Sequence, residues 1–172
     1  MKTNRDFKCP QILFLLLSTL LNLQAFTQDA FTKSESGTIQ LKPNFTAITV
    51  KNIDSSIAWY KKTLGLVQRN RVDSEERGFK QAVLTGSGIM IELVELKLML
   101  SPQECLKDHQ KGTELLGYYK FGFVVMEFDV WIKQLELLGV SFWGKVVTDE
   151  VSGQRTFLIA DPDGNLIQFF DS

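Results

Sequence analysis

The chain has 172 residues, of which 44% are hydrophobic and 23% charged, with 12 glycines and 4 prolines. This is the composition of an ordinary globular protein and excludes a disordered, collagen-like or disulfide-scaffold chain. The formal charge of −1 leaves no basic excess to neutralise phosphates, so a small molecule is a better expected partner than nucleic acid. The single histidine, His109, excludes a metal site built from two histidines and a carboxylate within one chain.

Residues 1–27 are predicted to be a signal peptide. A basic start precedes an apolar run at residues 12–23, which is shorter than the roughly 20 residues that span a bilayer. Ala25 and Thr27 are small residues suited to cleavage before Gln28. We therefore expect export to the periplasm or the cell exterior, with no stable membrane insertion after cleavage. An uncleaved membrane anchor is the alternative.

Removal of this segment would leave a formal charge of −3 and Cys105 as the one remaining cysteine, so no disulfide could form within the exported chain. Residues 28–43 are polar, contain a Ser/Gly cluster and are predicted to form a flexible lead-in.

The first structured unit is predicted to begin with a strand at residues 45–50, where apolar and polar residues alternate. Asp54 is expected to cap a helix over residues 55–64, which Gly65 ends. Three more strand-like runs follow the helix, at residues 66–72, 79–84 and 89–97.

A connection at residues 99–118 contains Cys105 and His109 and is expected to form a short helix after Ser101. The second unit then repeats the order of the first. It has a strand at residues 120–125, a helix with Asp129 as its cap and Gly139 at its end, and strand-like runs at residues 140–147, 154–160 and 165–170.

A constant offset relates the two units. Val50 and Val125 are 75 residues apart, Gly65 and Gly139 are 74 apart, and the turns at residues 85–88 and 161–164 are 76 apart. This predicts an α+β fold of two tandem βαβββ modules, residues 45–98 and 119–172. Each sheet would have one face covered by its helix and one bare face, and the bare faces would curve around a cavity as a cup-shaped mixed β-sheet.

Four segments of the chain resemble a known family: FTAITVKNIDSSIAWYKKTLGL, IMIELVEL, KFGFVV and FLIADPDGNLIQFF. They are similar, in order and spacing, to the vicinal oxygen chelate superfamily of glyoxalase I, bleomycin-resistance proteins and extradiol dioxygenases. The resemblance covers residues 45–171 and implies the same cup. It also implies a divalent metal in metal-dependent members, with one ligand from the first and one from the last strand of each module.

Those four ligand positions match Phe45, Glu92, Lys120 and Gln168 here. Phenylalanine has no lone pair to donate, and a lysine ammonium is a cation without an acceptor. Three or four good donors are normally needed for a divalent ion. We therefore expect no metal and no cofactor at this site.

Strand alternation extends the site to a ligand pocket. If the four positions share the cup floor, their neighbours two residues away share it as well. The predicted ligand-binding residues are Phe45, Ala47, Thr49, Met90, Glu92, Val94, Lys120, Gly122, Val124, Leu166, Gln168 and Phe170. The intervening residues are expected to be core: Ile48, Val50, Phe121, Phe123, Val125, Ile167 and Phe169.

Two roles are open for Glu92. Lys120 could replace the lost metal and neutralise its carboxylate, or Glu92 could be a catalytic acid or base, as the resemblance to glyoxalase-type enzymes implies, with Lys120 stabilising an oxyanion. Gln168 is expected to orient a ligand by hydrogen bonding, because an amide takes up no proton at neutral pH. The orientations of Arg69 and Arg155 are not fixed by the sequence.

Three functions remain. The leading one is an exported, metal-free protein that binds a small, partly apolar molecule in its cup, in the manner that the bleomycin-resistance branch implies. The alternatives are a glyoxalase- or dioxygenase-type enzyme, acting as a lyase, isomerase or oxygenase, and a structural or partner-binding module with a degenerate cup. The ligand, the presence of any catalysis and the formation of a homodimer stay open.

Overall fold

The structure is a computed structural model that describes residues 42–172. These residues form one compact unit. The predicted signal peptide and nearly all of the predicted lead-in fall outside the described residues. Between residues 42 and 172, no helix is long and apolar enough to cross a membrane.

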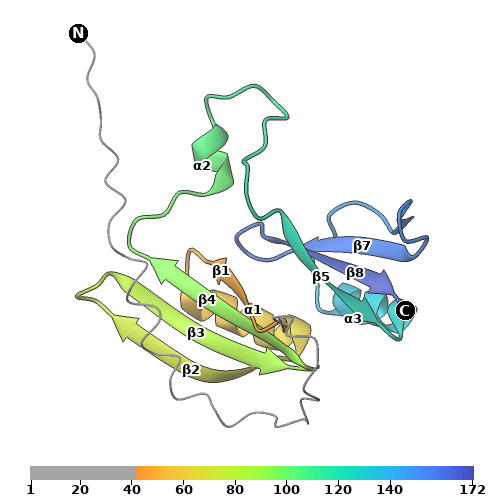
Figure 1. Ribbon diagram of the computed structural model, residues 1–172, viewed down its shortest axis with the longest axis horizontal. Helices are drawn as coiled ribbons and strands as arrows, with labels where there is room; N and C mark the ends of the chain where they lie inside the picture. Colours follow the sequence, from red (N-terminus) through yellow and green to blue (C-terminus); the bar gives the residue numbers. More distant parts are fainter. Residues whose placement is uncertain (1–41) are drawn as a thin grey trace, which may run out of the picture. The chain divides into compact units, whose positions relative to one another are not determined.

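The first module contains one helix and a four-stranded sheet (Figure 1). Its elements are β1 (Thr46–Thr49), α1 (Ile53–Leu64), β2 (Val67–Ser74), β3 (Phe79–Gly86) and β4 (Ile89–Leu96). The strand order is β1-β4-β3-β2, with β1 parallel to β4 and the other pairs antiparallel.

The second module has the same topology. After the short helix α2 (Pro102–Leu106) in the connection come β5 (Lys120–Val125), α3 (Phe128–Leu137), β6 (Val147–Thr148), β7 (Arg155–Ala160) and β8 (Leu166–Asp171). The strand order is β5-β8-β7-β6, with β5 parallel to β8. The predicted α+β fold of two βαβββ modules is therefore confirmed, and so is the helix after Ser101, which a capping box of Ser101 and Glu104 begins.

Strand register supports the offset that the sequence predicts. In the first module Ala47 pairs with Glu92 across the parallel strands, and in the second Gly122 pairs with Gln168. The antiparallel neighbours correspond too, with Val83 opposite Glu92 and Leu158 opposite Gln168. Ala47 and Gly122 are 75 residues apart, and Glu92 and Gln168 are 76 apart.

The start of α1 differs from the prediction. Asn52, not Asp54, is the N-cap, and its side chain accepts a hydrogen bond from the Ser55 backbone N–H at 2.9 Å. Asp54 lies in the first turn and forms an ion pair with Arg71. Both residue types can cap a helix, and here the chain is still extended at Asn52 (φ −141°), which is the cap conformation. At the other end Gly65 is left-handed (φ 66°), as expected.

Two predictions for the second module are wrong. The N-cap of α3 is Glu127, without a side-chain hydrogen bond, so Asp129 is not the cap; it pairs with Arg155 instead. The expected strand at residues 140–147 is reduced to one bridge between Phe142 and Ile159 and to the two-residue strand β6. Gly144 has a φ of 92°, which extended strand backbone does not allow, so the chain leaves the sheet at this point.

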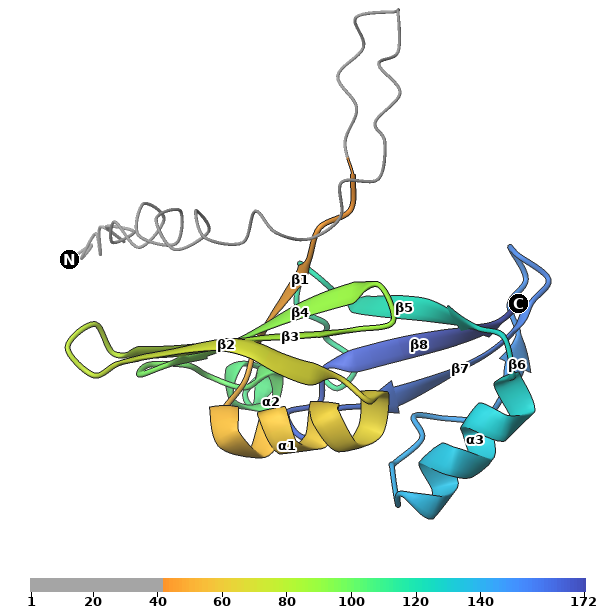
Figure 2. The same ribbon diagram turned by 90° about the horizontal axis from the view of Figure 1, so that it is seen from below.

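Each helix covers one face of the sheet of its own module, as Figure 2 shows for α1 and α3. The predicted core residues Ile48, Val50, Ile167 and Phe169 are buried, and Phe121, Phe123 and Val125 are half-buried against them. We call the side of each sheet that faces away from its helix the open face. Alternation along the strands therefore separates a core face from an open face, as predicted.

The β7–β8 turn joins the second module to the first. The Asp161 carboxylate accepts hydrogen bonds from the backbone N–H groups of Asp163 and Asn165, at 2.9 and 2.8 Å, and from the Asn165 side chain at 2.9 Å. It also accepts one from the hydroxyl of Tyr60 in α1, at 2.9 Å. Burial, reinforced by Asp161, raises the pKa of Tyr60, so the phenol remains a donor. The DPDGN segment, residues 161–165, therefore links the second module to α1 of the first by hydrogen bonds.

Candidate functional site

The open face of the first module carries the predicted site residues of β1 and β4. Ala47 and Thr49 are exposed on β1, and Met90, Glu92 and Val94 are half-buried on β4. Phe45 immediately precedes β1 and is 43% exposed. The register that pairs Ala47 with Glu92 and Thr49 with Val94 places these four side chains on one face.

The open face of the second module carries the remaining predicted residues. Lys120, Gly122 and Val124 are exposed on β5, and Val124 retains 62% of its accessible surface. Leu166 and Phe170 on β8 are half-buried, whereas Gln168 between them is only 7% exposed. The β5–β8 pairing again places them on one face. Each open face thus has apolar side chains around one of two polar site residues, half-buried Glu92 in the first module and buried Gln168 in the second.

Glu92 is that polar group in the first module. Burial raises the pKa of its carboxyl, and a hydrogen bond with the Gln81 side chain opposes the shift. Gln81 lies on the adjacent strand β3, diagonally across from Glu92, because it pairs with Val94. A carboxyl with a raised pKa exchanges a proton more readily near neutral pH than an ordinary glutamate does.

Gln168 is the corresponding group in the second module. Its Nε2 donates a hydrogen bond to Thr156 Oγ1 at 2.8 Å, and Thr156 Oγ1 donates to the Phe169 backbone carbonyl at 2.8 Å. Thr156 is buried on β7 and pairs with Phe170, so it lies diagonally across from Gln168. This chain of hydrogen bonds fixes the side chain of Gln168.

The sequence prediction did not include Gln81 or Thr156. They are 75 residues apart and occupy equivalent places in the two modules, each beside the polar residue of its own open face. The repeat offset, combined with strand alternation, was the signal that could have identified both residues.

Lys120 does not pair with Glu92. Among the ion pairs within residues 42–172 there is none between them, and the ammonium of Lys120 instead lies over the ring of Tyr119, 5.9 Å from its centroid. Lys120 is the exposed first residue of β5, and the two residues belong to different sheets. Of the two roles left open for Glu92, neutralisation of its carboxylate by Lys120 is therefore wrong.

The donor set at the four ligand positions does not fit a divalent metal. Phe45 offers no donor atom, Lys120 is a cation, and the amide nitrogen of Gln168 is engaged by Thr156. One carboxylate and one amide oxygen remain, fewer than such an ion normally requires. Within residues 42–172 no group of three or more His, Cys, Asp and Glu side chains could hold a metal.

The structure orients both arginines that the sequence left open. Arg155 pairs with Asp129 of α3 and with Asp171, and it lies 4.8 Å from the ring of Phe128, so it belongs to the helix side of its sheet. Arg69 donates a hydrogen bond to Thr85 Oγ1 at 2.8 Å. His109 and Cys105 are exposed in the connection.

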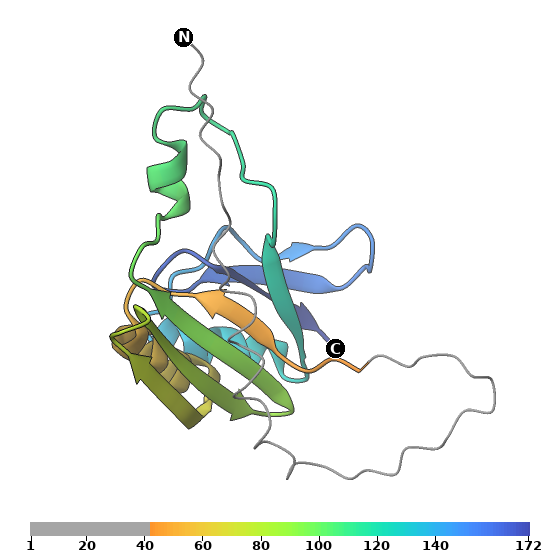
Figure 3. The ribbon, with the colours of Figure 1, turned by 60° about the vertical axis from the view of Figure 1, so that its left-hand side comes forward.

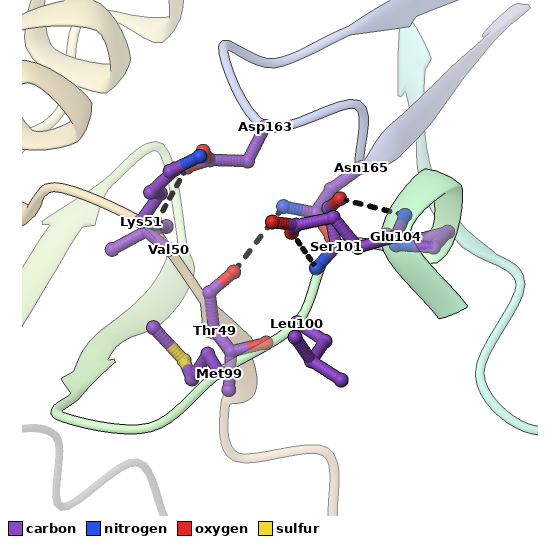
Figure 4. A pocket seen from close by; sticks show the side chains of 10 residues that line it. Thr49, Val50, Lys51, Met99, Leu100, Ser101, Glu104, Asp163 and Asn165 are labelled. Atoms are coloured by element: carbon purple, nitrogen blue, oxygen red, sulfur yellow. Dashed lines mark hydrogen bonds between the residues drawn. The ribbon is translucent and has the colours of Figure 1, made fainter. Parts of the chain in front are cut away.

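A cleft of about 340 Å³ lies beside the β7–β8 turn, and Thr49 is the one predicted site residue that lines it (Figure 4). Its polar groups bind one another. Lys51 N–H donates to Asp163 Oδ2 at 3.0 Å, the Asn165 amide to the Thr49 carbonyl at 3.4 Å, and Ser101 N–H to Glu104 Oε2 at 2.7 Å. The first two bonds link the end of β1 to the turn, and the third caps α2 within the connection (Figures 1 and 3). Because these polar groups already bind one another and stabilise the fold, the open faces, not this cleft, are the candidate binding site.

Comparisons with solved structures agree with this fold. A glyoxalase family protein from Enterococcus faecalis is similar with a TM-score of 0.65 and 18% identity, covering 75% of this chain and 96% of that one. An integron cassette protein from the mobile metagenome of the Halifax Harbour sewage outfall gives 0.56 and 27%, covering 77% and 100%. The fosfomycin resistance protein FosX from Listeria monocytogenes gives 0.59 and 13%, covering 77% and 94%.

No curated protein matches the sequence significantly. The sequence profile of the Glyoxalase/Bleomycin resistance protein/Dioxygenase superfamily matches residues 42–169, which is nearly all of the described part of the chain. The repeated topology, the shared register of the two open faces and this match lead to one conclusion. The chain belongs to the Glyoxalase/Bleomycin resistance protein/Dioxygenase superfamily, the vicinal oxygen chelate superfamily.

Proposed function

We propose that this protein binds a small, partly apolar molecule on the open faces of its two sheets, without a metal. The observation that carries the proposal is the pair of polar site residues, half-buried Glu92 and buried Gln168, each surrounded by apolar side chains on an open face. Apolar walls supply affinity, and a few placed polar groups orient a ligand. The donor set at the four ligand positions supports binding without a metal.

A fluorescence titration with the neutral probe N-phenylnaphthylamine tests the proposal. We expect saturable binding to the purified protein that is unchanged by a chelator. Val124→Asp places a charge on the open face of β5 and should weaken binding by about tenfold or more, equivalent to 1.4 kcal/mol. Val130→Asp is the matched control, because Val130 is an exposed valine on α3.

Three results would contradict the proposal: no saturable binding, equal effects of the two variants, or binding that a chelator abolishes. Absence of binding would favour a structural or partner-binding module. Equal effects would place the probe away from the open face.

The raised pKa of Glu92 favours a second candidate, an enzyme that uses this carboxyl as acid or base. Conversion of the hemithioacetal of phenylglyoxal and glutathione, followed by absorbance, tests it. Glu92→Gln should then slow turnover by about a hundredfold or more while the fold is kept. A wild-type rate equal to the uncatalysed rate would remove this reaction from consideration.

We also propose that the chain is exported, on the charge and apolar pattern of residues 1–27. Intact-mass measurement on protein recovered from its native host should give a mature chain that starts near Gln28. A cytoplasmic chain with Met1 intact would contradict export.

A further inference from the structure

The hydrogen bonds of the second module determine which end of the Gln168 amide is available on the open face. Thr156 has a single hydroxyl hydrogen, and it is donated to the Phe169 backbone carbonyl, which can only accept. The oxygen of Thr156 must therefore accept from Gln168, and only the amide nitrogen of Gln168 can donate. The amide oxygen, Oε1, then lies at the other end of the group.

The amide oxygen Oε1 of Gln168 accepts no hydrogen bond from the described part of the protein. No residue within 42–172 donates a hydrogen bond to it, and among the fully buried side-chain polar atoms of this region only Trp131 Nε1 lacks a partner. Oε1 is therefore an unpaired acceptor with some access to the surface, although Gln168 as a whole is buried.

Gly122 leaves this amide uncovered. It is the register partner of Gln168 on β5, and a Cβ at this position would lie 2.8 Å from the Gln168 backbone oxygen and 3.3 Å from its Cβ. The absence of a side chain at Gly122 thus allows the close approach of β5 and leaves the amide without a covering side chain from its register partner on β5.

The equivalent pair in the first module, Gln81 and Glu92, also leaves hydrogen-bond acceptors on the open face. Glu92, as a carboxylate, accepts a hydrogen bond from Gln81, and its remaining acceptor sites stay on the open face. The ammonium of Lys120 lies over the ring of Tyr119. The two equivalent places therefore both offer acceptors.

We infer that the Thr156–Gln168 pair selects a ligand carrying a hydroxyl or N–H donor, and that Gln168 Oε1 accepts its hydrogen bond. This inference rests on the proposed function and narrows its ligand class to hydrogen-bond donors with an apolar body. Gln168 is the contact residue, and Thr156 is a positioning residue that acts through it.

The test uses three small probes of one shape: indole has an N–H donor, N-methylindole lacks it, and benzofuran replaces it with an oxygen acceptor. Their affinities for the full-length protein are measured by calorimetry. A net hydrogen bond contributes about 0.5–1.5 kcal/mol, so indole should bind roughly threefold to tenfold more tightly than the other two. In Gln168→Met this preference should vanish while the affinity for N-methylindole is kept.

Thr156→Val separates positioning from structure. It removes the acceptor that holds the amide nitrogen, so Gln168 can turn over and present its N–H. Benzofuran should then gain affinity relative to indole, whereas Thr156→Ser should keep the wild-type preference. Thr148→Val, at an exposed threonine of β6, is the control and should change none of the ratios.

Equal affinities of the three probes for the wild type would overturn the inference and leave the proposed function intact. A preference that survives in Gln168→Met or in Thr156→Val would also overturn it. If none of these probes binds, and N-phenylnaphthylamine also fails to bind, the inference and the proposed function are both wrong.

Discussion

Single side chains give the two open faces different polar groups. Glu92 and Gln168 occupy equivalent places, yet one is a carboxyl whose pKa is raised by burial and the other a neutral amide. Each is held by a side chain on the neighbouring strand, Gln81 or Thr156, in the equivalent position. A change at one of these positions should therefore act locally on charge and orientation rather than on topology.

The pH dependence of stability should report the environment of Glu92. A raised pKa means that the folded protein holds this proton more tightly than the unfolded chain, so ionisation above the ordinary value of 4.5 costs stability. We expect Glu92→Gln to gain thermal stability over the wild type as the pH rises from about 4 to about 7. Thermal unfolding at several pH values measures the difference.

Glu104→Gln is the control of opposite sign. Hydrogen bonds from Ser101 lower the pKa of Glu104, so its ionised form stabilises the fold. Glu104→Gln should therefore lose thermal stability relative to the wild type as the pH rises. A Glu92→Gln variant that loses stability toward neutral pH would contradict the assigned environment.

Gly122→Ala should be destabilising, by about 1–3 kcal/mol, because the new Cβ would meet the Gln168 backbone oxygen at 2.8 Å. Denaturant unfolding measures this cost. Gly86→Ala is a graded comparison: its Cβ would meet a terminal methyl of Leu66 at 3.0 Å, which can move. Equal losses of unfolding free energy in the two variants would show that β5 can move away from β8 without cost.

At the scale of elements, the β7–β8 turn connects the modules through specific hydrogen bonds. Asp161 closes its own turn and reaches Tyr60, which is fully buried in α1. Lys51 N–H adds a second link to this turn through Asp163. The DPDGN segment therefore connects strand β8 to α1 as well as reversing the chain.

Tyr60→Phe should lower the free energy of unfolding by about 0.5–1.5 kcal/mol, because it deletes one buried hydrogen bond and keeps the ring. Denaturant unfolding at fixed pH measures it. Tyr118→Phe, at an exposed tyrosine of the connection, should have no effect. If Asp161→Ala costs no more than Tyr60→Phe, the carboxylate does not organise the turn.

At the scale of the whole molecule, the duplicated fold is present, while the four positions matched to the family's metal ligands do not form a donor set for a divalent ion. The two modules keep the strand order, the register and the open faces. Phe45 immediately precedes β1 and Lys120 begins β5, and neither side chain can bind a divalent ion. The scaffold is thus compatible with ligand binding by apolar contacts and hydrogen bonds.

The purified protein should contain no stoichiometric Ni, Zn, Fe or Mn, and a chelator should not lower its melting temperature. Introducing Phe45→His together with Lys120→His should create zinc affinity, because two imidazoles would join Glu92 and Gln168 Oε1 as donors. Metal analysis and calorimetric titration measure both, with each single variant as control. A tightly bound divalent ion in the wild type would refute the metal-free proposal.

Local sequence patterns determined most of the fold. Alternation in residues 120–125 gave a strand with those bounds, and the glycines after both helices ended them, because the period of a pattern and the backbone freedom of glycine are local properties. The near-constant offset then related the modules and placed Glu92 and Gln168 in equivalent positions.

Only the tertiary structure decided which groups meet. Asn52 and Asp54 are both good caps, and in the folded chain Asn52 caps α1 while Asp54 pairs with Arg71 of β2. The bond from Gln168 to Thr156, and the position of Lys120 over Tyr119, depend on which strands become neighbours and which partners compete for a side chain. The sequence by itself therefore determined most of the elements, their repeat and the side of each sheet on which a residue lies, but not the chain between α3 and β7. The partners of the charged and polar groups required the folded chain, because strand pairing brings together residues that no local period relates.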